Sequence, residues 1–272
     1  MKALILCAGM GNRLKPHTLK LAKPAIPFLG VPMMAYSLFY LESLGLTDFT
    51  INTHHLPNTV EQAAKNLVNP KHKLNFSFEP KIQDSAGGIS AAKKFLQDQD
   101  DFIVSNGDCV FLFEDSSPLH DLIQQHKDSK AIASFLVLKH KDAGVQFNAL
   151  WADEQMNFKH RGLATDLKDS TELNPYHYFG LAVYNQRIFN YLPENKPSSL
   201  FDDIIPKLVA NKEVIKLSST NKAIWFETGN PTSYNSAQKE LKNISSQNRS
   251  YQLAMDNIYN RFHISTPVIS EL

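Results

Sequence analysis

The chain has 272 residues, of which 43% are hydrophobic and 20% are charged, and its formal net charge is +1. This composition is typical of a globular protein with a substantial core, and the nearly balanced charge excludes a global basic field that would bind nucleic acid or a membrane surface. The two cysteines, Cys7 and Cys109, are too few for a disulfide framework and lack metal-ligand spacing, so we expect reduced, buried thiols.

The chain begins with a short apolar run inside "MKALILCAGM". This run is too short for the apolar core of a signal peptide, and no window reaches the ~18 apolar residues of a membrane span. We therefore expect a buried strand at 2–8 in a cytoplasmic protein.

The first part of the chain alternates strand and helix patterns. Apolar or alternating runs predict strands at 2–8, 48–55, 73–80 and 101–108, and helical spacing predicts helices at 32–46, 58–68 (with Asn58 as its cap) and 85–98. Repeated strand–helix units imply right-handed crossovers and a mostly parallel sheet with helices on both faces. The predicted fold class is α/β, with a Rossmann-like mixed sheet.

The pattern changes after a helix at 117–127 and a strand at 130–140. Between 142 and 183 it indicates shorter strands, of which 176–184 is the clearest. A last group of elements follows: a helix at 199–211, strands at 213–219 and 222–229, and helices at 231–244 and 251–262. Because no repeat or linker interrupts the chain, we expect a single domain at 1–244, followed by a C-terminal helical tail at 245–272.

The stretch "LCAGMGNRLKPHTLKLAKP" (6–24) forms the first strand-to-helix loop and contains no acidic residue. In open α/β sheets this loop is the usual ligand site. Gly9 and Gly11 allow the backbone N–H groups to approach phosphate oxygens, while Arg13 offers a fork of donors and Lys23 a compact charge. The loop therefore predicts a phosphate-bearing ligand.

Two common phosphate loops do not fit, since the stretch lacks both the third glycine of a dinucleotide fingerprint and the G-K-S/T of a P-loop. Residues 6–33 instead resemble the sugar-1-phosphate nucleotidyltransferases, whose signature reads L-x-x-G-x-G-x-R-L-x-P-x-T, then K-P, then G-x-P-M. The matching residues are Leu6, Gly9, Gly11, Arg13, Leu14, Pro16, Thr18, Lys23, Pro24, Gly30, Pro32 and Met33. The resemblance implies a glycosyltransferase-A-like fold and a nucleoside triphosphate held by Leu6, Ala8, Gly9, Met10, Gly11, Asn12 and Arg13.

Two acids, far apart in the chain, resemble the metal-binding acids of that family. Asp108 closes the strand in "DFIVSNGD", where the family's Asp binds Mg²⁺. The segment "AIWFETGNPTSY" (223–234) resembles the family's W-x-D-x-G-T-P-x-x-Y, with Glu227 in place of the second acid. Glutamate is one methylene longer, and Mg²⁺ demands near-ideal octahedral geometry. The resemblance thus implies Mg²⁺ held by Asp108 and Glu227.

Further site residues also come from the resemblance. Those assigned to the nucleotide, beyond the loop, are Gln83, Gly87, Gly88 and Asn106, and those assigned to the sugar are Gly180, Tyr178 and Asn148. An aromatic side chain packed on the core is the alternative for Tyr178. Many relatives grip the sugar phosphate with a lysine of an E-K-P segment, which is absent here; Lys159, His160 and Arg161 lie in the corresponding region.

The implied reaction joins a nucleotidyl group from an NTP, UTP or GTP, to a sugar-1-phosphate such as that of mannose, heptose or N-acetylmuramic acid, with release of pyrophosphate. Arg13, Lys23 and Asp108 would be catalytic. Two alternatives stay open: a glycosyltransferase that uses a finished nucleotide-sugar, although "NGDCVF" has one acid where D-x-D is usual, and a non-catalytic nucleotide-sugar sensor. The sequence indicates neither the base, the sugar nor the oligomeric state.

Overall fold

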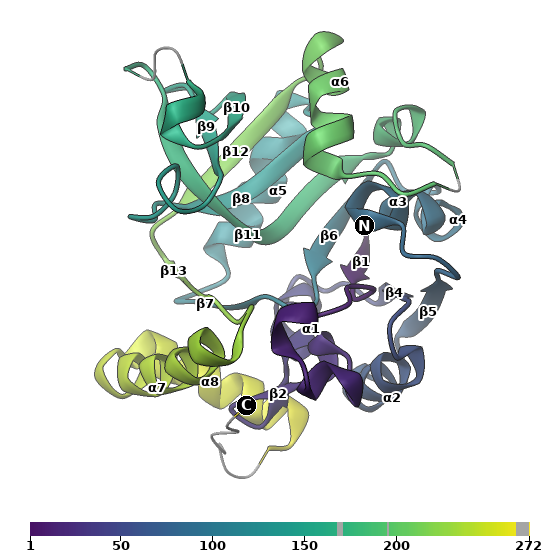
Figure 1. Cartoon of the computed structure of the whole chain (residues 1–272), viewed down its shortest axis with the longest axis vertical. Coiled ribbons are helices and arrows are strands. Elements are labelled where there is room, and N and C mark those ends of the chain that lie inside the picture. The colour runs from purple at the N-terminus through teal and green to yellow at the C-terminus, as the bar shows by residue number, and fades with distance from the viewer. Residues whose placement is uncertain (168–170, 195, 265–271) are drawn as a thin grey trace.

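The computed structural model describes residues 1–167, 171–194, 196–264 and 272. A nine-stranded sheet forms its centre, in the order β10-β9-β11-β6-β1-β4-β5, with β8 paired to β11 and β12 paired to β8. Its strands are β1 (Lys2–Leu6), β4 (Asp48–Thr53), β5 (Lys73–Phe78), β6 (Asp101–Asn106), β8 (Ala133–Leu138), β9 (Ala149–Ala152), β10 (Phe158–Gly162), β11 (Asn174–Asn185) and β12 (Ile215–Thr220). Figure 1 shows the long strands β8, β11 and β12 side by side, with β9 and β10 beyond them.

The sheet has two parts of different pairing. Strands β5, β4, β1 and β6 are mutually parallel, as strand–helix–strand crossovers require. Strand β11 runs antiparallel to β6, β8 and β9 and so joins the second part to the first. The expected mixed α/β sheet is confirmed.

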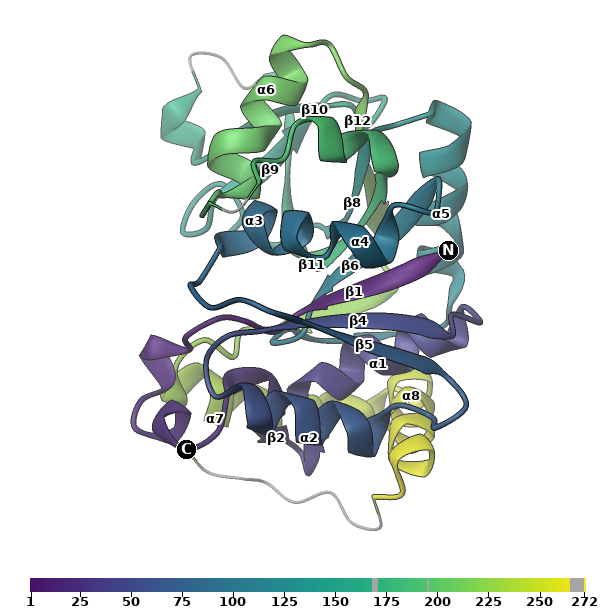
Figure 2. The ribbon, with the colours of Figure 1, turned by 90° about the vertical axis from the view of Figure 1, so that its right-hand side faces the viewer.

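Helices cover both faces, as Figure 2 shows with the sheet nearly edge-on. One face carries α1 (Met33–Ser43), α2 (Pro57–Leu67), α7 (Pro231–Gln247) and α8 (Arg249–Phe262), and the other carries α3 (Asp84–Ala91), α4 (Lys93–Leu96) and α6 (Ile205–Ala210). Helix α5 (Ser117–Ser129) packs on β8 and β12. Of the described helices, none is both long and apolar enough to cross a lipid bilayer.

Three local predictions differ from the structure. Helix α2 begins at Pro57 with Leu56 at the capping position, so Asn58 lies inside the first turn because proline is well suited to open a helix. The predicted helix at 85–98 is divided into α3 and α4, and the one at 199–211 begins as a π-helical turn, Leu200–Ile204, before α6.

Two short pairings were not predicted. They join β2 (Pro27–Phe28) to β3 (Val31–Pro32) and β7 (Val110–Phe113) to β13 (Ala223–Phe226), both antiparallel.

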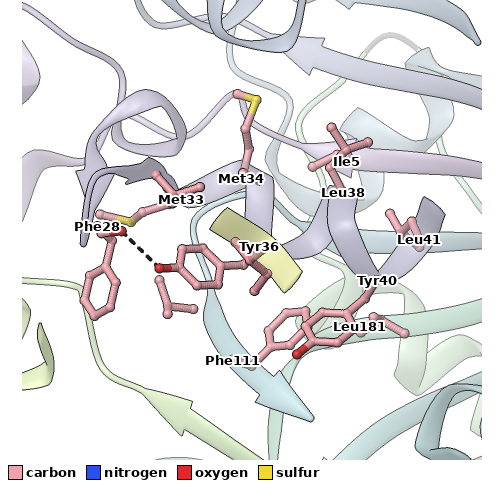
Figure 3. Packing of buried hydrophobic residues seen from close by; sticks show 14 of the residues in the cluster. Ile5, Phe28, Met33, Met34, Tyr36, Leu38, Tyr40, Leu41, Phe111 and Leu181 are labelled. Atoms are coloured by element: carbon pink, nitrogen blue, oxygen red, sulfur yellow. Dashed lines mark hydrogen bonds between the residues drawn. The ribbon is translucent and has the colours of Figure 1, made fainter. Parts of the chain in front are cut away.

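Helix α1 is buried on nearly all sides because it lies between the sheet and the C-terminal helices. In the core around it, Tyr36 Oη donates a hydrogen bond of 3.0 Å to the Phe28 carbonyl, and Tyr40 stacks on Phe111 at 5.7 Å between ring centroids (Figure 3). Burial of each such large side chain stabilises the fold by about 1.5–3 kcal/mol.

The C-terminal helix shares this core. Tyr251, Met255 and Ile258 of α8 are buried in the same cluster as α1. Helix α7 continues to Gln247, so the boundary expected after residue 244 falls inside a helix. Residues 249–262 therefore pack as part of the same compact unit.

Candidate active site

A cavity of about 470 Å³ opens at the edge of the sheet where the parallel strands end. Leu6, Asn52, Glu79 and Asn106, at or just after the ends of β1, β4, β5 and β6, line it together. Parallel strands end at one common edge, which is why residues so far apart in the chain meet here.

The glycine loop forms one wall of the cavity through Ala8, Gly9 and Gly11. Gly11 has φ +60°, and a Cβ there would lie 2.8 Å from Thr18 Cγ2, so the position requires glycine on two counts. A Cβ at Gly9 would meet nothing within 4 Å, which leaves the backbone of this residue open. The loop thus presents main chain rather than side chains to the cavity.

Lys23 and Asp108 form an ion pair at the cavity, 2.9 Å from Nζ to Oδ2. Lys23 belongs to a short turn, Lys23–Ala25, and its side chain is 12% exposed, whereas that of Asp108 is 40% exposed. Asp108 is held in place because the turn after β6 packs on β1, where Gly107 N donates to the Leu6 carbonyl at 2.9 Å. The structure therefore brings together a predicted cation and a predicted acid.

Strands β7 and β13 bring Glu227 to Asp108. Phe226 pairs with Val110, and Thr228 Oγ1 donates to the Asp108 carbonyl at 3.2 Å, so the segment after β13 lies against the segment before β7. Cys109 lies among these acids: burial and, next, the charge of Asp108 raise the pKa of its thiol to about 12. Burial likewise raises the pKa of Cys7, and neither cysteine is in a disulfide.

Arg13 reaches this acid pair from the glycine loop. Its Nη2 lies 2.6 Å from the point that a Cβ at Gly229 would occupy, beside the Glu227 carboxylate, which accepts a hydrogen bond from Gly229 N at 2.5 Å. A side chain at position 229 would displace the guanidinium. Arg13 and Asn12 are exposed, and neither they nor Met10 and Glu227 line the cavity.

Asp108 and Glu227 have the chemistry to hold a divalent cation. Among the described residues no hydrogen bond engages Asp108 Oδ1 or Glu227 Oε2, so each acid keeps one oxygen for a ligand. No cluster of three or more His, Cys, Asp or Glu side chains occurs in the described part of the chain. The two carboxylates would supply anionic oxygen ligands, the kind that Mg²⁺ takes in proteins.

The predicted base-binding glycines face protein groups. A Cβ at Gly87 would lie 2.7 Å from Gln83 Cβ, and one at Gly88 would lie 2.7 Å from Asn52 Nδ2. Both glycines are buried, and the cavity is reached instead by Ile82, Asp84 and Ser85 of the same segment. Gln83 directly precedes α3 and does not line the cavity.

The residues predicted for the sugar lie outside this cavity. Gly180 has φ +98° and lies against the turn after β6, since a Cβ there would be 2.9 Å from Cys109 Sγ. Tyr178 packs edge-on against Phe135, 5.2 Å between centroids, which is the packing alternative stated for it, and Asn148 is exposed before β9. Lys159 and Arg161 make ion pairs with Asp153 (2.9 Å) and Asp202 (3.0 Å).

An aromatic cluster that the sequence did not reveal lies next to the acids. It consists of His140, Phe147, His177 and Trp225; Trp225 belongs to β13, and Glu227 directly follows the last residue of that strand. The rings of His177 and Trp225 are 4.1 Å apart between centroids, and His177 is 9% exposed. Burial, and next the neighbouring His140, lower the pKa of His177 to about 4.

Sequence reasoning also missed Asn52 and Glu79, two buried polar residues of the cavity floor. A signal was present, since each is a polar residue in the last half of a predicted strand (48–55 and 73–80), toward the edge where the ligand is expected.

Comparisons with known proteins identify the family of the chain. Residues 2–244 match the family described as "Nucleotidyl transferase". The UTP–glucose-1-phosphate uridylyltransferase of Synechocystis is 27% identical over 264 residues, covering 90% of this chain and 65% of the relative. The mannose-1-phosphate guanyltransferase of Schizosaccharomyces pombe is 26% identical over 237 residues, covering 86% and 62%. The chain thus spans less than two thirds of the length of these relatives.

Solved structures share the fold. HddC from Yersinia pseudotuberculosis, complexed with GMP-PN, superposes with a TM-score of 0.70 at 21% identity, covering 88% of this chain and 98% of that one. The inositol-1-phosphate CTP transferase from T. maritima gives 0.72 at 18% identity, covering 95% and 96%. The resemblance seen in residues 6–33 is confirmed, and the chain belongs to the nucleotidyl transferase family.

Proposed function

We propose that this chain transfers a nucleotidyl group from an NTP to a sugar-1-phosphate, giving an NDP-sugar and pyrophosphate. The observation that carries the proposal is the Lys23–Asp108 pair, 2.9 Å apart at the cavity and next to the glycine loop. A cation, open backbone N–H groups and an acid at one cavity, with the segment of Glu227 against that of Asp108, suit the binding of a polyphosphate. Family membership supports the same reaction.

The reaction asks little covalent chemistry of the protein, because a phosphate oxygen of the sugar-1-phosphate attacks the α-phosphorus in line and pyrophosphate leaves. Positioning and charge neutralisation supply the rate. In this proposal the backbone of Gly9 and Gly11, with Arg13, binds the β- and γ-phosphates. Lys23 has three N–H donors, so it keeps its bond to Asp108 while it binds the α-phosphate, where negative charge increases during transfer.

Asp108 and Glu227 would hold Mg²⁺, which supplies charge stabilisation at the reacting phosphates when bound. The carboxylate of each residue is already anchored through one oxygen, Asp108 by Lys23 and Glu227 by Gly229 N. These bonds orient the remaining oxygens and lower the cost of assembling the site.

UTP or GTP is the proposed nucleotide, because similar proteins are named for uridylyl and guanylyl transfer. The aromatic cluster beside Glu227 is the proposed place for the sugar, together with Gly180 and Asn148, whereas Tyr178 packs on Phe135. Aromatic faces and histidine nitrogens suit a sugar ring and its hydroxyl groups.

The test is pyrophosphate release from each of the four common NTPs, paired with the 1-phosphates of glucose, mannose and N-acetylmuramic acid and with Mg²⁺. We expect turnover with one NTP–sugar pair that is lost in Asp108→Ala. Binding of an NTP without release from any pair would favour a sensor, and release of UDP or GDP from a finished nucleotide-sugar would favour a glycosyltransferase. Either result would overturn the proposal.

A further inference from the structure

A buried hydrogen-bond chain crosses the floor of the cavity and joins its two walls. Cys7 N donates to Asn52 Oδ1 at 2.5 Å, Asn52 Nδ2 donates to Glu79 Oε1 at 2.7 Å, and Gln83 N donates to Glu79 Oε2 at 2.9 Å. Cys7 begins the glycine loop and Gln83 precedes α3, whose first residues line the cavity. Asn52 is 2% and Glu79 1% exposed.

The two ends of this chain fix its direction. Both ends are backbone N–H groups, which can only donate. Asn52 must therefore turn its oxygen toward Cys7 and its amide nitrogen toward Glu79, and Glu79 must accept at both of its oxygens. Only a carboxylate accepts in this way, because a glutamine would present one donor to another donor.

Gly88 makes room for the chain. A Cβ at this position would lie 2.7 Å from Asn52 Nδ2, closer than real Cβ atoms come to a neighbour, and 3.0 Å from Glu79 Oε1, which is a tight contact. Glycine inside a helix costs up to about 1 kcal/mol relative to alanine. Its presence in α3 is explained by this close approach rather than by contact with a nucleobase.

We propose that Asn52 and Glu79 are a positioning pair whose hydrogen-bond direction sets the placement of the glycine loop relative to the start of α3, and hence the fit of the nucleotide between them. Strands β1, β4 and β5 are adjacent, so the pair spans the cavity floor from one wall to the other. The expected effect of this pair on kcat/KM rests on the proposed function. Neither residue needs to touch the reacting atoms.

The donor and acceptor of the middle hydrogen bond, between residues 52 and 79, can be exchanged while the bonds from Cys7 N and Gln83 N at the two ends are kept. In Asn52→Asp, two carboxylates face each other; in Glu79→Gln, a donor faces a donor. When both are made together, Cys7 N donates to Asp, the glutamine amide donates to the same Asp, and Gln83 N donates to the glutamine oxygen. Every donor and acceptor of the hydrogen-bond chain is again paired. The side chains keep nearly the same volumes, and the net charge of the protein does not change.

The experiment is the full cycle of these two single variants and the double variant, read out as kcat/KM for the NTP. We expect each single change to lower kcat/KM about tenfold or more, mainly through KM, because a buried polar group without a partner distorts the site. The double variant should recover to within about threefold of the unaltered protein, since coupled residues in contact are non-additive. Additive losses, or single variants without loss, would overturn the inference.

A matched control separates positioning from general destabilisation. Asn75 Nδ2 also donates to a carboxylate, Asp48 Oδ1 at 2.9 Å, but at the opposite end of the same strands. Asn75→Asp should lower the melting temperature and leave KM unchanged. An equal rise of KM in this control would assign the effect to stability alone.

Two readouts do not depend on catalysis. Hydrogen exchange at the amides of Cys7 and Gln83 should accelerate in the single variants and return in the double variant. Calorimetric titration with UTP and GTP should follow the same order. If exchange follows the cycle but neither nucleotide binds any variant or the unaltered protein, the positioning pair stands and the proposed function fails; if exchange is the same in all four proteins, the pair is wrong whatever the activity.

Discussion

The two parts of the sheet build their shares of the site by different means. In the parallel part, β5, β4, β1 and β6 end at one edge, and the cavity is lined by the glycine loop and by residues at those ends, both apolar (Leu6) and polar (Asn52, Glu79 and Asn106). In the antiparallel part, around β11 and β8, the neighbouring space is filled by the aromatic cluster His140, Phe147, His177 and Trp225. The first part is set by topology and the second by side-chain packing.

This difference separates the two proposed substrates. A nucleotide binds where backbone geometry places N–H groups, and such geometry is shared across a fold. A sugar would be read by side chains, which can change while the fold is kept. The parallel part should therefore govern the reaction itself, and the antiparallel part should govern the choice of sugar and respond most to pH.

Among the tests of this comparison, the largest effect on turnover is expected when the acid at the cavity is removed. Asp108→Ala should reduce kcat by about 10²-fold or more, since loss of one preorganised charge at a transition state typically costs about 2.7–4 kcal/mol. Asp108 is 40% exposed on its side chain, so the melting temperature should change little. Steady-state release of pyrophosphate measures the effect.

The matched control is Asp115→Ala. Asp115 also pairs with a lysine, Lys222 at 3.0 Å, but lies at the far end of the β7–β13 ribbon. This variant should keep full turnover. Near-normal turnover of Asp108→Ala, or equal losses in the two variants, would remove Asp108 from the mechanism.

In the antiparallel part, acid should act through His177. Burial lowers the pKa of His177 from 6.5 to about 4, so between these values the unfolded chain binds a proton that the folded chain does not. The stabilising contribution is complete above pH 6.5 and is lost as pH falls toward 4, by about 1.4 kcal/mol per pH unit and about 3 kcal/mol in total. Denaturant unfolding across this range measures the slope.

His177→Phe should make the slope shallower, because an aromatic ring is kept and the titrating group is removed. His126, whose pKa is also lowered by burial, and Glu79, whose pKa burial raises, remain in both proteins and contribute to the residual slope with opposite signs. Equal slopes in the two proteins would show that His177 is not the group that titrates.

The same contrast explains what the sequence could predict. Strand and helix periodicity predicted the parallel part and its common edge, and the family resemblance, in residues 6–33 and again at "DFIVSNGD", predicted that Lys23 and Asp108 belong to one site. The β7–β13 ribbon that brings Glu227 to Asp108 was not predicted, because Val110–Phe113 is a four-residue apolar run that periodicity cannot assign. The aromatic cluster depends on packing between β8, β11 and β13, which are far apart in the chain. Periodicity in a single sequence does not predict such contacts.

A smaller effect, on the magnesium dependence of the rate, is expected for substitutions of Glu227, which lies between the two parts of the sheet. Glu227→Gln keeps the shape and removes one of two anionic ligands, so the Mg²⁺ concentration for half-maximal rate should rise about tenfold, equivalent to about 1.4 kcal/mol. Glu227→Asp keeps the charge and should stay close to the unaltered value. A magnesium titration of the rate distinguishes them; equal responses of the two variants would exclude a ligand role.

The smallest effect concerns the helix packed behind the parallel part. Arg261 of α8 binds Glu42 of α1 through two hydrogen bonds of 2.7 Å and also donates to the Leu67 carbonyl at 3.1 Å. Exposed ion pairs contribute little, but Glu42 is only 10% exposed and the contact is bidentate, so Arg261→Ala should lower the free energy of unfolding by about 1–2 kcal/mol. Because α8 shares the core of α1, unfolding should stay a single transition, with kcat and KM unchanged, in denaturant titrations followed by fluorescence and circular dichroism. A separate early transition would instead show that residues 249–262 unfold on their own. The parallel part would then be stable without the contacts of α8.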